Sequence, residues 1–360
     1  MKETFMKNGP RIEGQSPGWT SWLFLPVFLI LSACSCSTEG GLQQILGTSA
    51  EAPVFLDCRP VSSTELVFRF SSPVRVVSLH FDSPVETESV EEGREVKITF
   101  ARPPEEGIKI VADILVEDPD RNTLNVIVPF RARNERIPAL VFNEIRTEYT
   151  KPKVEFIEFF ALEAGNLGAL RLFVAGHSLS KPVYEFAPVE VKARDYIVLH
   201  LRTVEEGCVD ETGQDLALSN GTEAPKDVRD LWLPGSAKLL HKTDALWLMD
   251  QDDRIIDAVL LCENPKEWGK NNSAAAAEFL GRNGAWLPPT ASGTAADGAE
   301  GEEGTFIPDY ASAVNTAGTT LTRTICRDEN LPPRPRIDNW YITANSGATP
   351  GKPNSVKRYQ

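Results

Sequence analysis

The sequence has little histidine and lacks the residue spacings of common catalytic and metal-binding motifs. Its four histidines, at positions 80, 177, 200 and 241, show neither H-E-x-x-H nor H-x-x-x-H spacing. No C-x-x-C pair occurs in the part expected to fold, which argues against structural zinc. No glycine-rich phosphate loop follows a strand, and Gly176–Ser180 is not a G-x-S-x-G elbow. We therefore expect no cofactor and no catalytic site.

Basic residues are scarce relative to acidic ones. The 360 residues include 37 Lys and Arg against 51 Asp and Glu, which gives a formal net charge of -14. This charge balance argues against electrostatic binding of nucleic acid or anionic lipid over a broad surface, although it is compatible with a local basic patch. Carboxylate pairs such as Glu155 and Glu158 are too common in so acidic a chain to indicate acid–base catalysis. Nucleic acid is not an expected partner.

Long helices and long hydrophobic runs are also expected to be few. The 26 prolines and 25 glycines make turns frequent, whereas 41% hydrophobic residues are enough for a core in roughly two domains. The apolar run Trp19–Leu31 has about 13 residues, fewer than the roughly 20 that a membrane-spanning helix needs. The composition therefore favours an all-β fold.

The N-terminal segment resembles a bacterial lipoprotein signal peptide. Basic residues precede the apolar run, and Leu31-Ser32-Ala33-Cys34 follows directly at its end. The resemblance implies that a signal peptidase recognises Leu31, Ser32 and Ala33 and cleaves before the cysteine. The Cys34 thiol would then carry a diacylglyceryl group, and two or three acyl chains make membrane anchoring stable. The alternative is that the apolar run is a buried strand or helix.

We expect residues 1–33 to be the signal peptide, with Met1 or Met6 as its start, and residues 34–51 to be a lipidated flexible tether. The leader has one net positive charge, so the mature chain is still more acidic and an acidic membrane should repel it. Ser35 replaces the Asp that retains many lipoproteins in the inner membrane, which favours the outer membrane. The sequence does not distinguish exposure to the periplasm from exposure at the cell surface.

Cysteine usage defines no disulfide framework. Five cysteines lie beyond Cys34, an odd number, and two of them are Cys36 and Cys58. In an exported protein, one or two disulfides could form among Cys208, Cys262 and Cys326. The alternative is that these side chains are buried as small hydrophobes.

Residues 52–135 alternate apolar and polar residues with a period of two, which predicts strands rather than helices. Val77, Leu79 and Phe81 are expected to share one face of such a strand. The series resembles the immunoglobulin-like (Ig-like) or fibronectin-type β-sandwich spacers of bacterial surface proteins. The acidic loop Glu117–Asp120 offers carboxylates for calcium, but it lacks the spaced ligands and the closing Glu of a calcium loop. A solvated hairpin loop is the preferred interpretation.

The second half contains a series of motifs in one order. It runs from Val141–Ile145 through the paired strands around Asp250–Asp253 to the terminal Ala348–Asn354. The asparagine-glutamate-isoleucine opening, the D-x-D turn and the T-P-G-x-x-N ending together resemble a lamin tail domain, which is an Ig-like β-sandwich. The resemblance covers residues 136–355. The fold prediction is therefore two β-sandwich domains in tandem, 52–135 and 136–355, after the signal peptide and tether.

The same motifs have physical interpretations of their own. Asn143 and Glu144 are expected to orient neighbouring backbone at a strand edge through side-chain hydrogen bonds. The Asp250–Asp253 segment is the polar turn of a hairpin whose strands carry alternating apolar residues. Pro350 and Gly351, with Thr349, are expected to end the last strand, because proline cannot donate to a ladder and glycine permits a reversal.

Two long insertions are expected in the second domain, at about 202–234 and 263–319. The second contains a low-complexity run, 290–304, which we interpret as a mobile surface loop. Trp268, Phe279 and Trp286 could be exposed binding aromatics, but a short helix over Ala274–Leu280 that packs Phe279 on the sandwich is the preferred interpretation.

The function expected from these features is non-catalytic. The chain would be a lipid-anchored binding or scaffolding module of the bacterial envelope, with a protein or glycan partner at sheet edges or inserted loops. The alternative is an envelope hydrolase, nuclease-like or phosphatase-like, with metal-dependent activity in the insertions. The candidate metal ligands there are Asp227, Asp230, Glu263 and Glu267.

Overall fold

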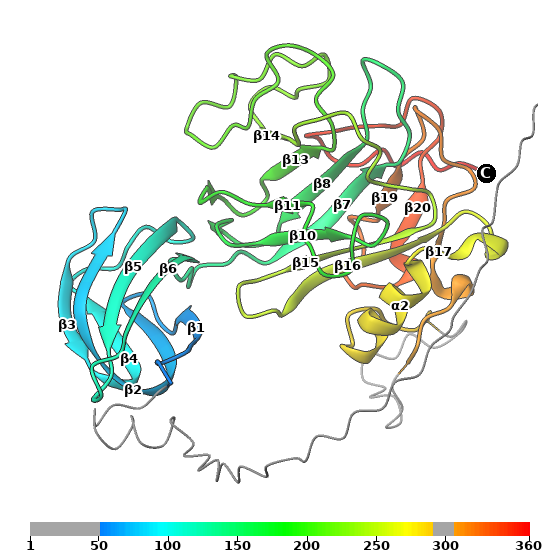
Figure 1. Ribbon diagram of the computed structural model, residues 1–360. Helices are drawn as coiled ribbons and strands as arrows, with labels where there is room; N and C mark the ends of the chain where they lie inside the picture. Colours follow the sequence, from blue (N-terminus) through cyan, green and yellow to red (C-terminus); the bar gives the residue numbers. More distant parts are fainter. Residues whose placement is uncertain (1–50, 291–305) are drawn as a thin grey trace, which may run out of the picture. The chain divides into compact units, whose positions relative to one another are not determined.

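The computed structural model describes residues 51–290 and 306–360, and it confirms the all-β prediction (Figure 1). These residues form mostly strands in several sheets, with a single short α-helix in the described ranges. Ser49–Gln360 belong to one compact unit. Leu31, Ser32, Ala33 and Cys34 lie outside the described residues, as do almost all of the expected tether and residues 291–304 of the low-complexity run.

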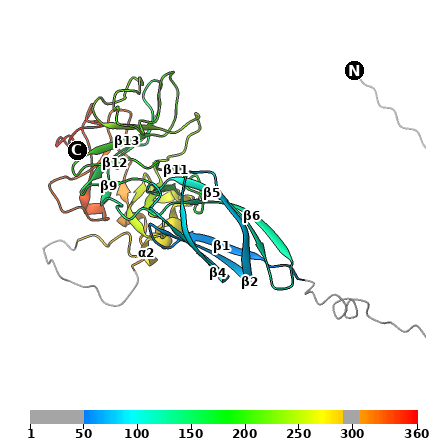
Figure 2. The ribbon, with the colours of Figure 1, turned by 90° about the vertical axis from the view of Figure 1, so that its left-hand side faces the viewer.

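The N-terminal β domain is a six-stranded sheet built around one long strand. Its order is β3-β4-β2-β5-β6, and β1 also pairs with β2. The first half of β2 pairs with β1 and β4, and its second half pairs with β5, so that one strand joins two groups of neighbours (Figure 2). The strands are β1 Phe55–Pro60, β2 Glu65–Phe81, β3 Thr87–Glu91, β4 Gly93–Phe100, β5 Lys109–Glu117 and β6 Thr123–Arg131.

A bulge in β2 overturns one expectation about its faces. Val76 pairs with Val116 and Ser78 with Leu115, so Val77 is an extra residue in the ladder. Val77 is consequently 45% exposed, while Leu79 and Phe81 pack against the core. The prediction that all three share one face was wrong, because an inserted residue moves every side chain beyond it to the opposite face.

The C-terminal β domain consists of two main sheets over one hydrophobic core. The first has the order β11-β10-β15-β16-β18, and the second has the order β14-β13-β8-β7-β19-β20. A two-stranded pair, β9 with β12, lies outside both. The strands of the first sheet are β10 Arg171–Val174, β11 Tyr184–Glu185, β15 Asp244–Met249, β16 Ile255–Cys262 and β18 Val314–Asn315. The others are β7 Leu140–Arg146, β8 Phe156–Ala161, β9 Gly165–Asn166, β12 Glu190–Val191, β13 Tyr196–His200, β14 Arg229–Trp232, β19 Ile325–Arg327 and β20 Trp340–Ile342.

The D-x-D hairpin is confirmed by the pairing of β15 with β16, in which Leu246 lies opposite Val259. Both strands contribute fully buried residues to the core, and Phe173 of β10 stacks on Trp247 with ring centroids 5.2 Å apart. The turn Asp250–Asp253 is therefore held at the end of a ladder whose side chains are excluded from water.

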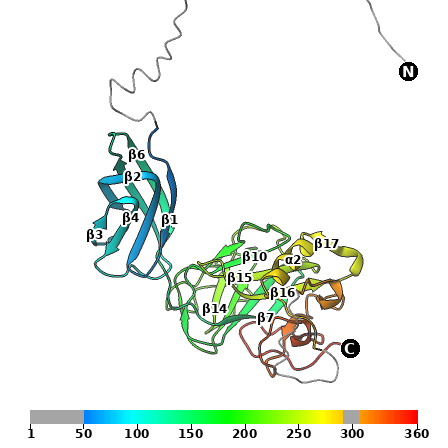
Figure 3. The same ribbon diagram turned by 90° about the horizontal axis from the view of Figure 1, so that it is seen from below.

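The expected short helix is present as α2, Ser273–Arg282, which lies beside β15 and β16 (Figure 3). It buries Leu280 completely and leaves Phe279 37% exposed, 5.8 Å from the Trp247 ring. Trp286 is 1% exposed and its indole nitrogen donates to the Ser312 carbonyl. The alternative that Trp286 is an exposed binding aromatic was therefore wrong. Near the helix are β17 Trp268–Asn271 and three short 3-10 helices, Pro265–Glu267, Tyr310–Ser312 and Ile337–Asn339.

The four described cysteines form no disulfide. Cys262 and Cys326 are buried, and burial raises the pKa of the Cys326 thiol well above its usual value. For these two residues the small-hydrophobe alternative holds, because each occupies a strand position inside a packed sheet. Cys208 is only partly buried, in the first insertion. Across the described ranges, no helix has the length and hydrophobicity needed to cross a membrane.

Core packing in the N-terminal β domain gives a matched stability prediction. Ile98 on β4 is fully buried, whereas Ile127 on β6 is 66% exposed. We expect Ile98→Ala to lower the free energy of unfolding by about 2–5 kcal/mol, because it removes buried methyl groups and leaves a cavity. Ile127→Ala is the control and should stay within about 0.5 kcal/mol. Urea unfolding of both variants measures the difference, and equal losses would contradict the packing described above.

Candidate functional site

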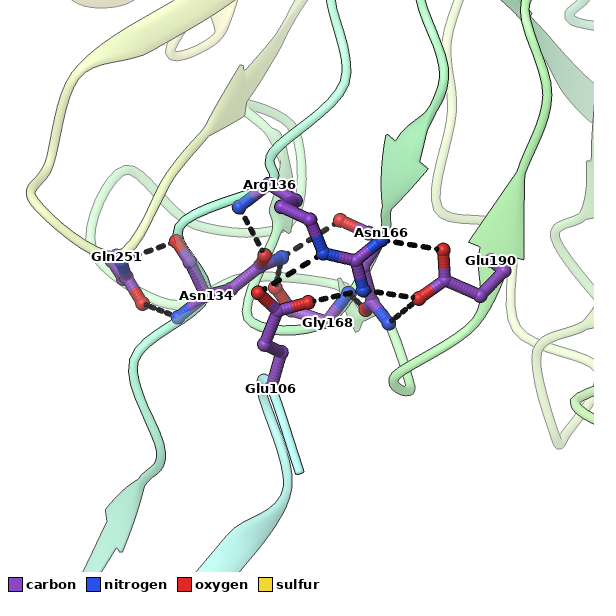
Figure 4. A network of polar contacts seen from close by, with 7 residues as sticks. All are labelled: Glu106, Asn134, Arg136, Asn166, Gly168, Glu190 and Gln251. Carbon is purple, nitrogen blue, oxygen red and sulfur yellow. Dashed lines mark hydrogen bonds and ion pairs between the residues drawn. The ribbon is translucent and has the colours of Figure 1, made fainter. Parts of the chain in front are cut away.

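The N-terminal β domain joins the C-terminal β domain through residues 132–139, which follow β6 and precede β7. This segment and the loops around it form a network of polar contacts that we call the junction (Figure 4). Its partners come from the β4–β5 loop, from the segment after β9, from β12 and from the β15–β16 turn. The junction therefore ties distant parts of the chain together.

Asn134 lies at the centre of the junction and is 1% exposed. Its side-chain nitrogen donates to the carbonyl oxygens of Asn166, at 2.7 Å, and Gly168, at 2.8 Å. Its side-chain oxygen accepts the backbone N–H of Arg136 at 2.9 Å. Its own backbone exchanges two hydrogen bonds of 2.9 Å with the Gln251 side chain. Both donors of the buried amide are thus satisfied, as burial requires.

Arg136 lies between two carboxylates from different domains. Its guanidinium bonds Glu106 through Nε at 3.2 Å and through Nη2 at 2.6 Å. The opposite side bonds Glu190 at 3.0 and 2.7 Å, and Asn166 donates to the same Glu190 carboxylate at 2.8 Å. The hydrogen bonds with Glu190 and Glu106 raise the pKa of Arg136, and Arg136 lowers that of Glu190. Arg136 is half exposed, so each ion pair contributes at most about 1 kcal/mol, and its main effect is to fix geometry.

Two further arginines bridge the domains beside Arg136. Arg133 forms a bidentate pair with Asp252 at 2.9 and 2.8 Å, which raises the pKa of Arg133 and lowers that of Asp252. Arg131 bonds the Glu185 carboxylate at 2.5 Å and the Gly107 carbonyl at 3.1 Å. Planar guanidinium groups suit such paired contacts because their donors have a fixed geometry.

The backbones themselves meet at two glycines. Gly107 has φ +72°, and a Cβ there would lie 2.5 Å from the Gly168 Cα. In the other direction, a Cβ on Gly168 would lie 2.9 Å from the Gly107 Cα. The two loops can approach this closely only because neither residue has a side chain. The junction is consequently a main-chain contact reinforced by side-chain bonds.

The residues singled out by the N-E-I motif lie elsewhere, inside the C-terminal β domain. Asn143 and Glu144 are buried on β7, which lies between β8 and β19 and is not an edge strand as predicted. The expected role in orienting backbone is nevertheless present, because Glu144 accepts the backbone N–H of Thr349 at 3.0 Å. Glu158, opposite Glu144 on β8, accepts the N–H of Gly351 at 2.5 Å.

The T-P-G motif therefore does not end a strand, since β20 already stops at Ile342. Its N–H groups add donors to two buried carboxylates, which also accept hydrogen bonds from the Thr324 hydroxyl and the Asn143 amide. Burial raises the pKa of Glu144, and burial together with the neighbouring Glu144 charge raises the pKa of Glu158 well above its usual value.

The metal ligands expected for a hydrolase are not assembled. Asp230 is fully buried, and its Oδ1 lies 2.9 Å from His200 Nε2, beside the stacked Trp232 ring. Two of the others form ion pairs with lysines, and one is exposed on a loop. Within residues 51–290 and 306–360, no group of three His, Cys, Asp or Glu could hold a metal ion. The candidates concerned are Asp227, Asp230, Glu263 and Glu267.

The acidic segment Glu117–Asp120 lies at the β5–β6 hairpin turn, as the preferred interpretation expected, with Glu117 as the last residue of β5. The loop is not fully solvated, because Asp118 is buried. Asp118 accepts the backbone N–H of Asn122 at 2.8 Å and its side-chain N–H at 2.9 Å. These bonds use the carboxylate to close the turn.

Comparison with known proteins identifies the family. The family model TP_1001_2nd, described as a protein second domain, matches residues 138–342. The chain belongs to this family. The family domain begins two residues after Arg136 and contains every strand from β7 to β20. The chain is also similar to an uncharacterized protein of Treponema pallidum (strain Nichols), at 25% identity over 218 residues. That match covers 56% of this chain and 54% of the relative, so the chain spans about half the length of the curated relative it matches.

No sequence motif marks the junction residues. Asn134 belongs to no recognised motif, and its partners at 166, 168 and 251 are distant in sequence. The one local signal is the density of arginine at positions 131, 133 and 136 in an otherwise acidic chain. That signal shows that a contact with carboxylates is favoured there, but not which carboxylates take part.

The junction gives a prediction for Asn134. Asn134→Ala should lower the free energy of unfolding by about 1–3 kcal/mol, because two buried carbonyls lose their donor. It should also speed cleavage by trypsin after the junction arginines. Asn125→Ala, at an exposed position of β6, is the control and should change neither quantity. Urea unfolding and timed proteolysis measure both effects. Identical behaviour of the two variants would contradict a stabilising role for Asn134 in the junction.

The buried carboxylates give a pH prediction. The folded-state pKa of Glu158 is raised, so at intermediate pH the folded chain keeps a proton that the unfolded chain has lost. Stability from this group is present below the usual pKa of a glutamate and is lost as pH rises through the raised value. Between pH 5 and pH 7 the wild type should therefore lose stability relative to Glu158→Gln, which has no proton to release. Urea unfolding at both pH values tests this, and parallel pH profiles would contradict it.

Proposed function

We propose that the protein is a lipid-anchored, non-catalytic binding or scaffolding protein of the bacterial cell envelope. The observation that carries the proposal is the junction, where Arg136 bonds carboxylates of both β domains, Asn134 bonds the C-terminal β domain, and the Gly107 and Gly168 backbones touch. A spacer joined to the family domain by such contacts transmits a defined orientation, as scaffolding requires. A flexible linker would not do so.

Anchoring forms the second part of the proposal. Leu31, Ser32 and Ala33 would direct cleavage before Cys34, and the lipidated cysteine would hold the chain at the membrane, with the outer membrane favoured. The acidic composition supports a position away from anionic lipid surfaces. The N-terminal β domain would then act as a spacer between the tether and the family domain.

The binding surface would lie on the family domain, at sheet edges and on the first insertion. That insertion is packed onto the domain, because Glu223 pairs with the buried Arg146 and the Tyr184 hydroxyl donates to Asp210. It nevertheless exposes Val209 and Leu218 by more than two fifths. Apolar side chains presented on a fixed loop suit a protein or glycan partner. The lamin-tail resemblance remains part of this proposal.

Membrane fractionation tests the anchoring part. Cys34→Ala should move the protein from the membrane fraction to the soluble fraction, because the acylated thiol is lost. Cys36→Ala is a close control, since it removes a cysteine two positions away and should leave the protein with the membrane. Metabolic labelling with a radioactive fatty acid should mark the control and not the Cys34 variant. Retention of the Cys34 variant in the membrane fraction would refute lipid anchoring.

Thermal unfolding with added metal separates this proposal from the hydrolase alternative. A binding protein without a metal centre should show no change in Tm with Mg, Mn, Ca or Zn, because only a ligand of the folded state raises it. A rise of several degrees with one of these ions would favour the hydrolase. In that case, replacement of Asp230 by Asn would show whether the insertion supplies a ligand.

A further inference from the structure

A cleft of about 490 Å³ lies at the junction, and arginines dominate its charge. Its volume is within the range of small-molecule sites, about 300–1,000 Å³. Arg59 comes from β1, Arg131 and Arg133 from the end of β6 and the segment after it, and Arg171 from β10. The remaining polar groups at its rim belong to the β15–β16 turn.

The charge of the cleft is opposite to that of the chain. Four arginines face two aspartates, Asp252 and Asp253, in a protein whose formal net charge is -14. Like charges brought together in one cleft raise the local potential and attract ions of the opposite sign.

Two of the four arginines already use both terminal guanidinium nitrogens in hydrogen bonds. Arg133 uses both of its terminal nitrogens in the bidentate pair with Asp252. Arg131 uses its two terminal nitrogens on Gly107 and Glu185. These two side chains therefore mainly hold the domains together.

The other two arginines keep donors available. Arg59 is about half exposed and contacts Asp57 only through Nη2, at 3.2 Å. Arg171 also uses Nη2, which donates to the Asp250 carbonyl at 2.5 Å and to Asp253 at 2.7 Å. Among the described residues, no hydrogen bond involves Nε or Nη1 of either arginine. Arg59 keeps further N–H donors beside the one that contacts Asp57, and release of Asp253 would free an Nη2 donor of Arg171 next to its unused Nε. Each guanidinium can then present two adjacent donors to a carboxylate or phosphate.

We propose that this cleft binds a small polyvalent oxyanion, a molecule with at least two carboxylate or phosphate groups, that bridges Arg59 and Arg171. One arginine belongs to each β domain, so the bound anion would link the domains and stabilise the junction. It competes with Asp253 for Arg171, and Asp253 can yield because it is three quarters exposed. This inference goes beyond the proposed function and does not depend on lipid anchoring.

Isothermal titration calorimetry on the full chain in mild detergent tests the site. The probes are pyrophosphate and citrate, each titrated at constant ionic strength set with chloride. Saturable binding in the wild type should weaken about tenfold in Arg59→Gln and in Arg171→Gln, because one charged hydrogen-bonding group contributes about 1.4 kcal/mol or more. Arg75→Gln is the matched control, since Arg75 is an exposed, ion-paired arginine of β2 outside the cleft, and it should bind as the wild type does.

The outcomes show whether the cleft binds an anion and whether that anion carries phosphate or carboxylate groups. Binding of pyrophosphate alone assigns a phosphate ligand, binding of citrate alone assigns a carboxylate ligand, and binding of both supports the shared chemistry. Arg59→Gln is the more decisive variant, because Arg59 has no bond to the other domain and its loss should leave unfolding unchanged. No binding to either probe at about 10 mM, or equal affinity in Arg59→Gln and wild type, overturns the proposal. Neither result affects the Cys34 fractionation test.

Discussion

The contact between the Gly107 and Gly168 backbones is the constraint on which the arrangement of the two β domains depends. Two loops can meet this closely only without side chains, and the meeting brings buried carbonyls that need donors. Asn134 supplies those donors from the connecting segment itself. The ion pairs of Arg131, Arg133 and Arg136 surround this glycine contact. Because the backbone contact already defines the geometry, these partly exposed ion pairs need not stabilise it strongly.

The distribution of charge gives the junction a second property. An acidic chain places several of its arginines in one short segment, where they neutralise carboxylates from both domains. Arg59 and Arg171 add positive charge to one side of it and keep donors unused. The connecting segment therefore borders the proposed anion site, to which Arg131 and Arg133 also contribute.

Several carboxylates are buried inside the family domain. Two of them, Glu144 and Glu158, lie opposite each other on central strands and accept hydrogen bonds from side chains and from backbone N–H groups of Thr349 and Gly351. Burial raises the pKa of both carboxyl groups, and the Glu144 charge adds to the shift at Glu158. The C-terminal segment is thus part of the domain's polar interior even though it lies beyond the 138–342 match.

The sequence by itself determined the all-β class, the hairpin around Asp250–Asp253 and helix α2, because alternation and turn chemistry act over a few residues. Tertiary structure alone decided the rest. The bulge at Val77 depends on pairing with β5, and the central position of Glu144 depends on β19, which is far along the chain. The junction depends on partners up to 119 residues away, so no local pattern could reveal that Asn134 is its centre.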